Sequence, residues 1–347
     1  MQCGDFKTTY SADMSIFEAP LTRVLVATFV VLLFTLPLYA SGYALDVANR
    51  IGIAVIGAIG LNILTGFTGL ISLGNAAFMA IGAFSAGYLA TKYSAPFYIT
   101  IPAAGLITAL LGMFVGIPSL RIKGLYLAMA TLAAHFIVEF IVVKWESVTG
   151  GVNGLSIPVP KIGEYALDND KRIFMLIYVV VVATVIFSRN LFRSKPGKAF
   201  IAIRDQAISA EVMGVNLLKY KLMSFGISSY FIGVAGALTA YQAKIISPET
   251  FPITVAIDYL GMIIIGGMGS VLGSIYGAIF ITLLPEVLRL ATSALSASYP
   301  SLVTVLSSMK ELVFGALVII FLIFEPEGIV ARWHSIRNYW KLYPFSH

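Results

Sequence analysis

The chain has 347 residues, of which 59% are hydrophobic and 12% are charged, and its mean hydropathy is +0.91. Repeated apolar runs of about 18 or more residues can each cross a hydrocarbon core of roughly 30 Å, which excludes a water-soluble protein and predicts a polytopic membrane protein. The formal net charge of +6 is then better explained by basic residues gathered on one side of a membrane than by nucleic-acid binding.

Taken in chain order, the apolar runs predict an all-α fold with about ten transmembrane helices. We expect spans at residues 24–44, 47–65, 67–90, 97–118, 124–143, 172–189, 222–242, 255–269, 271–290 and 304–326. The first run lacks a small-residue cleavage site after it, so we expect a retained span and not a signal peptide. The predicted organisation is one transmembrane domain over 24–326, between cytoplasmic tails at 1–23 and 327–347.

Basic residues indicate the orientation of these spans. With the N-terminus inside, most of the 23 lysine and arginine residues fall on the cytoplasmic side, and the densest cluster lies at 189–221. An even number of spans returns the C-terminus to the cytoplasm, so both termini are expected inside. The only cysteine, Cys3, provides neither a disulfide framework nor a cysteine metal cluster.

Glycine and small polar residues interrupt two apolar stretches, 62–88 and 261–278. Small residues also permit close helix packing, which is the plain structural explanation. A broken helix, however, exposes backbone polar groups that lipid does not tolerate unless the break lines an enclosed or water-filled passage. We therefore predict a translocation path lined by Asn62, Thr65, Gly66, Gly69, Ser72, Asn75, Gly266, Gly267 and Gly269.

Ionisable side chains within the spans are few, and each is a functional candidate. His135 and Glu139 are four residues apart and share a helix face, so they could relay protons, bind a metal or form a polar contact between helices. No third ligand stands at helical spacing, so no metal site is predicted. Glu286 and Arg289 are expected to neutralise each other, and Asp258 is expected at a helix N-terminus, where a carboxylate is favoured.

Two loops are longer than a connection needs. The first, at 144–171, is predicted on the periplasmic side, and its turn-forming residues Gly150, Gly151, Asn153 and Gly154 make it either a docking surface or a plain connector. The second, at 190–221, is predicted in the cytoplasm.

The second loop contains an amphipathic helix at 197–216. At 100° per residue, Ile201, Ile208, Val212 and Val215 form one stripe, while Arg204, Asp205 and Glu211 flank it. This helix is too short and too charged to span, so it lies on the membrane surface or meets a soluble partner; spacing alone does not choose between them.

Several function classes lack their motifs. The one Gly-Lys pair, at 197–198, has Phe192 where a phosphate-binding loop requires an earlier glycine, so ATP binding by that device is excluded. No H-E-x-x-H, G-x-S-x-G or paired-cysteine motif indicates an enzyme, and no selectivity-filter signature indicates a channel. A non-catalytic transporter subunit, with no catalytic residue and no cofactor bound by this chain, is the class that fits best.

The sequence resembles the permease subunits of branched-chain amino acid ABC importers of the LivM type. The resemblance is carried by "TGFTGLISLGNAAFMAIGA" (65–83), "RIKGLYLAMATLA" (121–133), "TGGVNGL" (149–155) and 197–238, with "SPETF", "GGMGSVLGSIYGA" and "EPEGI" further along, and so covers roughly 47–330. One departure concerns "TLAAHFIVEF", which has Phe136 where the family often has an acidic residue. Cargo is therefore expected to be branched-chain amino acids, with urea, amides and aromatic or other carboxylic acids as alternatives.

The resemblance also implies the partners. It implies a bacterial inner-membrane complex with a homologous second permease, two P-loop ATPases that use ATP and Mg²⁺, and a periplasmic substrate-binding protein that docks near "TGGVNGL". The cytoplasmic loop would couple to the ATPase through Ile201, Arg204, Asp205, Ile208, Glu211, Val212 and Gly214. An ion-coupled secondary transporter using Glu139, Asp258 or Glu286, or a membrane scaffold, remains as an alternative.

Overall fold

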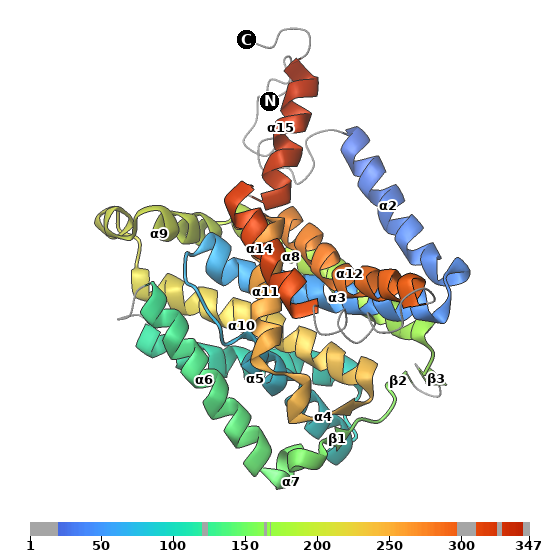
Figure 1. The fold of residues 1–347 in the computed structure, drawn as a ribbon. Coiled ribbons are helices and arrows are strands. Elements are labelled where there is room, and N and C mark those ends of the chain that lie inside the picture. Colours follow the sequence, from blue (N-terminus) through green and yellow to red (C-terminus); the bar gives the residue numbers. More distant parts are fainter. Residues whose placement is uncertain are drawn as a thin grey trace.

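A computed structural model describes residues 20–119, 124–162, 165–166, 168–296, 310–324 and 328–342. The expectations for residues 1–19 lie outside this part of the chain. The described part is almost entirely helical (Figure 1). In a bilayer this is the expected outcome, because a helix satisfies its own backbone hydrogen bonds where no water is present.

The first half of the chain supplies the helices α2 (Pro20–Tyr39), α3 (Gly42–Asn62), α4 (Asn75–Lys92), α5 (Phe97–Ser119), α6 (Leu125–Lys144) and α7 (Glu146–Thr149). The second half supplies α8 (Asp170–Arg193), α9 (Lys195–Val212), α10 (Leu217–Ala243), α11 (Ile253–Gly266), α12 (Val271–Ser296), α14 (Lys310–Phe324) and α15 (Gly328–Leu342). Short turns are the π-helical η1 (Ile63–Phe67) and the 3₁₀ turns η2 (Gly151–Asn153) and η3 (Pro248–Thr250).

The helices α3 and α10 form the buried centre of the bundle. Helix α10 packs against α3, α4 and α5, and α3 also packs against α8, α11 and α12 (Figure 1). Glycines permit the closest crossing: a Cβ on Gly82 of α4 would lie 2.2 Å from the carbonyl oxygen of Gly233, and one on Gly236 would lie 2.0 Å from that of Met79. The α4–α10 contact is thus made backbone to backbone, as small residues allow in membranes.

Seven helices in the described part are long and apolar enough to cross a membrane. They lie at Gly42–Phe67, Phe97–Pro118, Leu125–Lys144, Asp170–Arg193, Leu217–Ala243, Pro248–Gly266 and Val271–Leu290, and a shorter apolar helix covers Val24–Tyr39. The all-α polytopic prediction is confirmed, but the count of about ten spans is not. The expected span at 67–90 is interrupted, because the chain is non-helical over 68–74 and α4 begins only at Asn75.

The two ends of the bundle differ in structure. At one end α9 packs against α8 and α10 and projects from the side of the bundle (Figure 1). At the other, two small antiparallel sheets pair β1 (Leu155–Ser156) with β4 (Ile245–Ile246) and β2 (Lys161–Ile162) with β3 (Tyr165–Ala166). We name these the α9 end and the sheet end.

Helix α9 is not the single straight helix that the spacing predicted. Gln206 has φ −157° and ψ 91°, which is extended backbone, and this kink divides α9 into 195–205 and 207–212. The first half is held in the bundle by Phe200 and Ile203, which are buried. The second half leaves Ile208 and Val212 exposed, so the apolar stripe predicted from Ile201 to Val215 is divided by the kink.

Candidate functional site

The two glycine-interrupted stretches meet at the α9 end of the bundle. We call this meeting point the glycine joint, comprising residues 62–69 and 266–270. Asn62 holds its two sides together: its amide nitrogen donates to the carbonyl oxygen of Ser270 at 2.8 Å and to Oγ of Ser274 at 2.7 Å. The Asn62 amide oxygen accepts from the backbone nitrogen of Gly269 at 2.9 Å. Because Asn62 is buried, these bonds form where water does not compete.

Glycine is required on both sides of the joint. A Cβ on Gly66 would lie 1.7 Å from Oδ1 of Asn62, and one on Gly266 would lie 1.9 Å from the carbonyl oxygen of Gly273. Gly69, Gly267 and Gly269 have positive φ angles of 75°, 118° and 77°. Since L side chains rarely adopt such angles, the breaks in α3 and between α11 and α12 depend on glycine.

Arg204 of α9 contacts the joint directly. Its Nη1 donates to the carbonyl oxygen of Gly66 at 3.0 Å, while its Nε and Nη2 both lie 2.9 Å from Oδ1 of Asp205. The side chain also packs on Gly69, where an added Cβ would lie 3.1 Å from Cγ of Arg204. Arg204 was expected on the flank of an amphipathic helix. Its position four residues after the buried Phe200 is the signal that it faces the spans.

A cavity of about 770 Å³ lies at the joint. It is lined by Thr65, Gly66, Gly69, Ile71, Arg204, Gly267, Met268, Gly269, Ser270, Val330 and Ala331. Five residues of the predicted path therefore share one cavity, and the base of α15 closes one side of it. The other four predicted residues, Asn62, Ser72, Asn75 and Gly266, do not line it.

The non-helical segment 68–74 contains buried polar groups. Thr68 donates to the carbonyl oxygen of Ile63 at 2.9 Å, and the backbone nitrogen of Leu73 donates to Oγ1 of Thr131 on α6 at 2.9 Å. Ser72 and Asn75 are both buried. The Asn75 amide has no hydrogen-bond partner in the described part of the chain. Protein groups thus satisfy several of the polar atoms that the broken helix exposes, as a membrane interior requires.

The second half of α9 is the exposed part of the segment predicted to couple to a partner. Ile208 is 69% exposed, Val212 is 82% exposed and the adjoining Met213 is 85% exposed. Asp205 and Glu211 are exposed beside them, Ile201 is half-buried, and Gly214 ends the helix with a positive φ of 88°. An apolar surface of this kind on a short charged helix is suited to a protein or membrane partner.

The loop between α6 and α8 is tied to the sheet end. Gly150, Gly151 and Gly154 all have positive φ angles, and a Cβ on Gly154 would lie 2.3 Å from the carbonyl oxygen of Ile246. Asn153 lies in η2 and is exposed. Nearby, Lys244 lies 2.8 Å from Asp168 and holds the pKa of that exposed carboxyl below its usual value by hydrogen bonding and charge.

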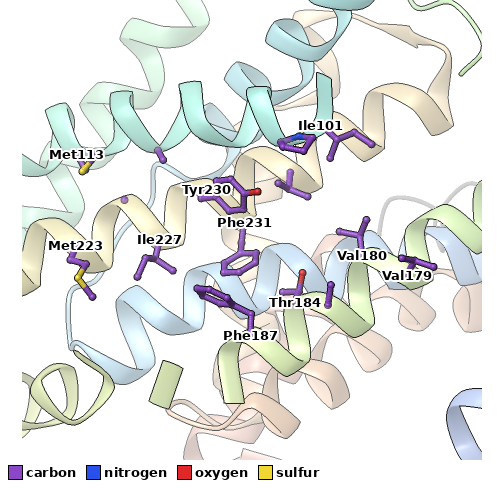
Figure 2. A pocket seen from close by; sticks show the side chains of 15 residues that line it. Ile101, Met113, Val179, Val180, Thr184, Phe187, Met223, Ile227, Tyr230 and Phe231 are labelled. Atoms are coloured by element: carbon purple, nitrogen blue, oxygen red, sulfur yellow. The ribbon is translucent and has the colours of Figure 1, made fainter. Parts of the chain in front are cut away.

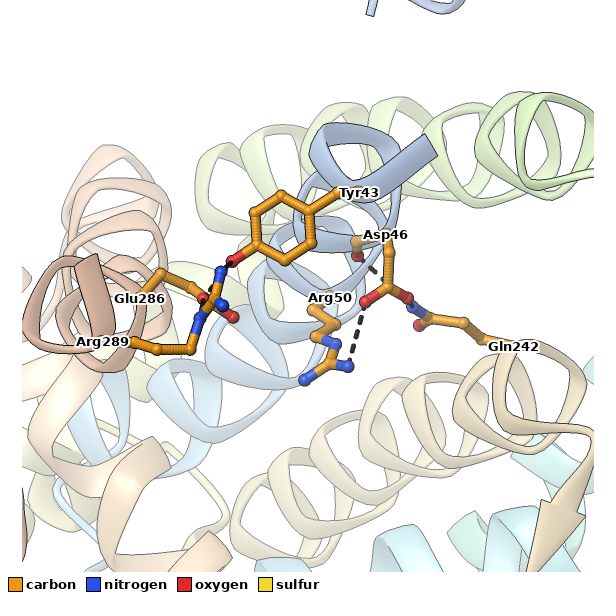
Figure 3. Close-up of polar contacts among 6 residues, drawn as sticks. All are labelled: Tyr43, Asp46, Arg50, Gln242, Glu286 and Arg289. Atoms are coloured by element: carbon orange, nitrogen blue, oxygen red, sulfur yellow. Dashed lines mark hydrogen bonds and ion pairs between the residues drawn. The ribbon is translucent and has the colours of Figure 1, made fainter. Parts of the chain in front are cut away.

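A polar cluster links three helices at the sheet end. Its members are Tyr43, Asp46 and Arg50 of α3, Gln242 of α10, and Glu286 and Arg289 of α12 (Figure 3). Nε of Arg289 lies 3.1 Å from Glu286, which confirms the predicted pair, and Tyr43 donates to Glu286 while accepting from Arg289. Asp46 accepts from Gln242 at 2.9 Å and pairs with Arg50 at 2.9 Å. The Glu286–Arg289 and Asp46–Arg50 pairs have helical i, i+3 and i, i+4 spacing, whereas the contacts of Tyr43 and Gln242 with them join different helices and were not predictable from spacing.

His135, Glu139 and Asp258 are the other ionisable candidates within the spans. His135 is buried, its Nε2 lies 3.8 Å from Glu139, and neither ring nitrogen has a hydrogen-bond partner among the described residues. Asp258 lies in the second turn of α11 and not at its N-terminus, because that helix begins at Ile253. Within the described ranges no group of three or more His, Cys, Asp or Glu side chains is placed to hold a metal ion.

A second cavity, of about 700 Å³, has an almost wholly apolar lining (Figure 2). It lies between α5 and α8 over α10, with Ile101, Met113, Val180, Phe187, Ile227 and Tyr230 among its walls. No sequence pattern indicated it, because residues from three helices far apart in the chain make up its lining.

Comparisons with known proteins place these features in context. Residues 43–322 match the family described as "Branched-chain amino acid transport system / permease component". This range includes the glycine joint from Asn62 to Ser270 and the whole of α9.

Curated proteins show the same relationship. The chain is 30% identical over 321 residues to the high-affinity branched-chain amino acid transport system permease protein LivM of Salmonella typhimurium, covering 85% of this chain and 71% of the relative. It is 29% identical over 335 residues to LivM of Escherichia coli, covering 89% of this chain and 75% of the relative. A more distant match is the autoinducer 2 import system permease protein LsrC of Salmonella paratyphi B, 27% identical over 205 residues, 55% of this chain and 56% of that protein. No solved structure matches.

Proposed function

The chain belongs to the branched-chain amino acid transport permease family, and from this membership we propose that it is one of two permeases in an ATP-driven importer for branched-chain amino acids. The complex moves its cargo inward across a bacterial inner membrane. Its energy comes from separate ATPase subunits that bind ATP and Mg²⁺, and this chain binds no cofactor of its own.

The observation that carries this proposal is that α9 has an exposed apolar half and a half bonded to the spans. A helix that projects from the side of the bundle exposes Ile208, Val212 and Met213, yet its first half reaches the broken spans through Arg204. Exposed apolar side chains suit a partner that covers them, and a direct bond to the spans suits a partner whose movement is passed on.

The orientation follows from the distribution of charge. The chain around α9 carries the densest set of lysine and arginine residues, at 189–221, and such residues favour the cytoplasmic side. We therefore place the α9 end in the cytoplasm and the sheet end in the periplasm. Both termini then lie in the cytoplasm.

The cavity at the glycine joint is the inner part of the translocation path in this proposal. Its backbone and hydroxyl groups, including those of Thr65 and Ser270, offer polar contacts without a fixed charge other than that of Arg204. Such a lining passes several small zwitterions and does not distinguish leucine from valine. Cargo selection is accordingly assigned to a periplasmic binding protein, which docks at the sheet end near Gly150–Gly154.

Reconstitution tests this function. The chain, its companion permease, the two ATPases and the binding protein are placed in proteoliposomes, and uptake of radiolabelled leucine is followed with and without ATP. We expect uptake that requires both ATP and binding protein, with unlabelled isoleucine and valine competing. Urea, an amide and an aromatic acid are added as competitors to test the other cargo classes of the family. Leucine uptake driven by an ion gradient in the absence of ATP would contradict the proposal and favour an ion-coupled transporter.

A further inference from the structure

The coupling segment and the glycine joint are held together at one side chain, Arg204. Its three guanidinium nitrogens are all engaged within the chain: Nη1 with the carbonyl oxygen of Gly66, and Nε and Nη2 with Asp205. Asp205 offsets its charge. These contacts use three of the five N–H donors of the guanidinium, and the side chain is 38% exposed, so an acidic group on another protein would find two donors and an already paired charge.

The carbonyl that Arg204 holds belongs to the π-helical turn η1. A π turn shifts the helical hydrogen-bonding register by one residue, and such turns are frequent at functional sites. The turn adjoins Gly69, where an added Cβ would lie 3.4 Å from Cα of Arg204, so backbone as well as side chain is in contact. Arg204 also approaches the other side of the joint, residues 266–270, since a Cβ on Gly269 would lie 2.8 Å from Nη1 of Arg204.

The kink in α9 separates the Arg204 contact from the exposed half of the helix. Gln206, with its extended backbone, separates Arg204 from the exposed apolar half at 207–212. Movement of Ile208 and Val212 can reach the bundle by two routes, forward through 213–216 into α10 and back across the kink. On the second route, Arg204 is the side chain before the kink that bonds to the glycine joint. Asn62 then links both sides of the joint through Gly269 and Ser270.

We propose that Arg204 is a positioning residue that transmits movement of α9 to the glycine joint through the Gly66 carbonyl, and that it does not serve as an ATPase-docking charge. This rests on the proposed importer function and revises the role of one residue within it. ATPase docking is then left to the exposed half of α9, and Arg204 sets whether the inner cavity opens when the ATPase moves.

The test uses the complete transporter in proteoliposomes with Arg204→Ala, Arg204→Lys and, as the matched control, Lys198→Ala, which removes an exposed cation from the same helix. Three quantities are measured: ATPase subunits retained per permease, ATP hydrolysed, and leucine imported per ATP. We expect Arg204→Ala to retain the ATPase and hydrolyse ATP while importing at least roughly tenfold less leucine per ATP, a change of about 1.4 kcal/mol in coupling. Lysine, which lacks the planar fork, should not restore it.

The accessibility of the cavity to a thiol reagent is a second measurement. Its response to ATP should change only if Arg204 transmits movement, and not if Arg204 merely stabilises the fold. Cys3→Ser provides a background without native cysteine, and Ile71→Cys places a thiol in the cavity lining, where Ile71 is partly exposed. The rate of maleimide labelling should change when ATP is added in the native chain and in Lys198→Ala. In Arg204→Ala it should no longer respond to ATP.

Each contrary result is distinct. Loss of the ATPase from Arg204→Ala, or full rescue by lysine, would assign Arg204 to charge-based docking and overturn the inference. Native leucine import per ATP and native labelling in Arg204→Ala would also overturn it. A failure of the proposed function itself would be seen in the native chain, which would then show neither bound ATPase nor ATP-dependent uptake.

Discussion

Replacing Ile208 and Val212 together by serine should detach the ATPase while leaving the permease folded. The two side chains are 69% and 82% exposed in the chain alone. Fully burying an aliphatic side chain is worth about 1.5–3 kcal/mol, so covering these two fractions contributes roughly 2–4 kcal/mol to docking. At about 1.4 kcal/mol for each factor of ten, the double variant should bind its ATPase roughly 30- to 1,000-fold more weakly.

The assay is the dissociation constant between the purified permease and the isolated ATPase subunit, measured in detergent by a labelled-partner titration. Ser209→Ala, an exposed residue on the same half-helix, is the matched control and should bind like the native chain. Serine and isoleucine have similar helix propensities, so the helix itself is little changed. An affinity of the double variant within about threefold of native, with normal elution on size exclusion, would refute the assignment of this half-helix to docking.

Three further changes test the packing and the joint. Gly236→Leu forces a side chain toward the Met79 carbonyl oxygen, which lies only 2.0 Å from the Cβ position. This overpacking should cost about 1–3 kcal/mol or more and lower the thermal midpoint of unfolding in detergent. Gly315→Leu is the control and should leave the midpoint unchanged, because an added Cβ there has nothing within 4 Å. Asn62→Leu leaves the Gly269 nitrogen and Ser270 oxygen without their partner and should reduce leucine uptake more than Asn49→Leu, a buried asparagine of the same helix; equal uptake would remove the joint from the path. Gly69→Ala and Gly124→Ala share a positive φ, but only Gly69 meets Arg204, since an added Cβ at Gly124 has nothing within 4 Å. Only Gly69→Ala should therefore lower leucine import per ATP.

Helix class and most spans could be predicted because they depend on local composition. Runs of apolar residues predicted α5, α6, α8, α10 and α12 within a few residues of their observed bounds. The break before α4 was less visible, since residues 67–90 remain apolar on average and only glycine and polar residues at 66–75 indicate it. Average hydropathy does not report where the backbone leaves the helix.

The glycine joint was predictable as two stretches but not as one site. Both stretches were recognised from small and polar residues, yet their meeting depends on Asn62 reaching Ser270 across more than 200 residues of chain. The kink at Gln206 likewise has no glycine or proline to indicate it. Arg204 lies before that kink, one turn after the buried Phe200, and so shares its inward face. The stripe predicted from Ile201 to Val215 runs across the kink, which is why it left Arg204 on its flank.

The most direct test of the central claim is affinity purification of this chain from its native host in mild detergent, with mass spectrometry of the co-purified proteins and an ATPase assay on the eluate. We predict recovery of a second permease of the same family together with P-loop ATPases, and ATP hydrolysis in the eluate. The same preparation from the Ile208→Ser/Val212→Ser chain should lose the ATPases. Recovery of the native chain alone, in several detergents and after cross-linking, would contradict the claim that α9 couples this permease to an ATPase.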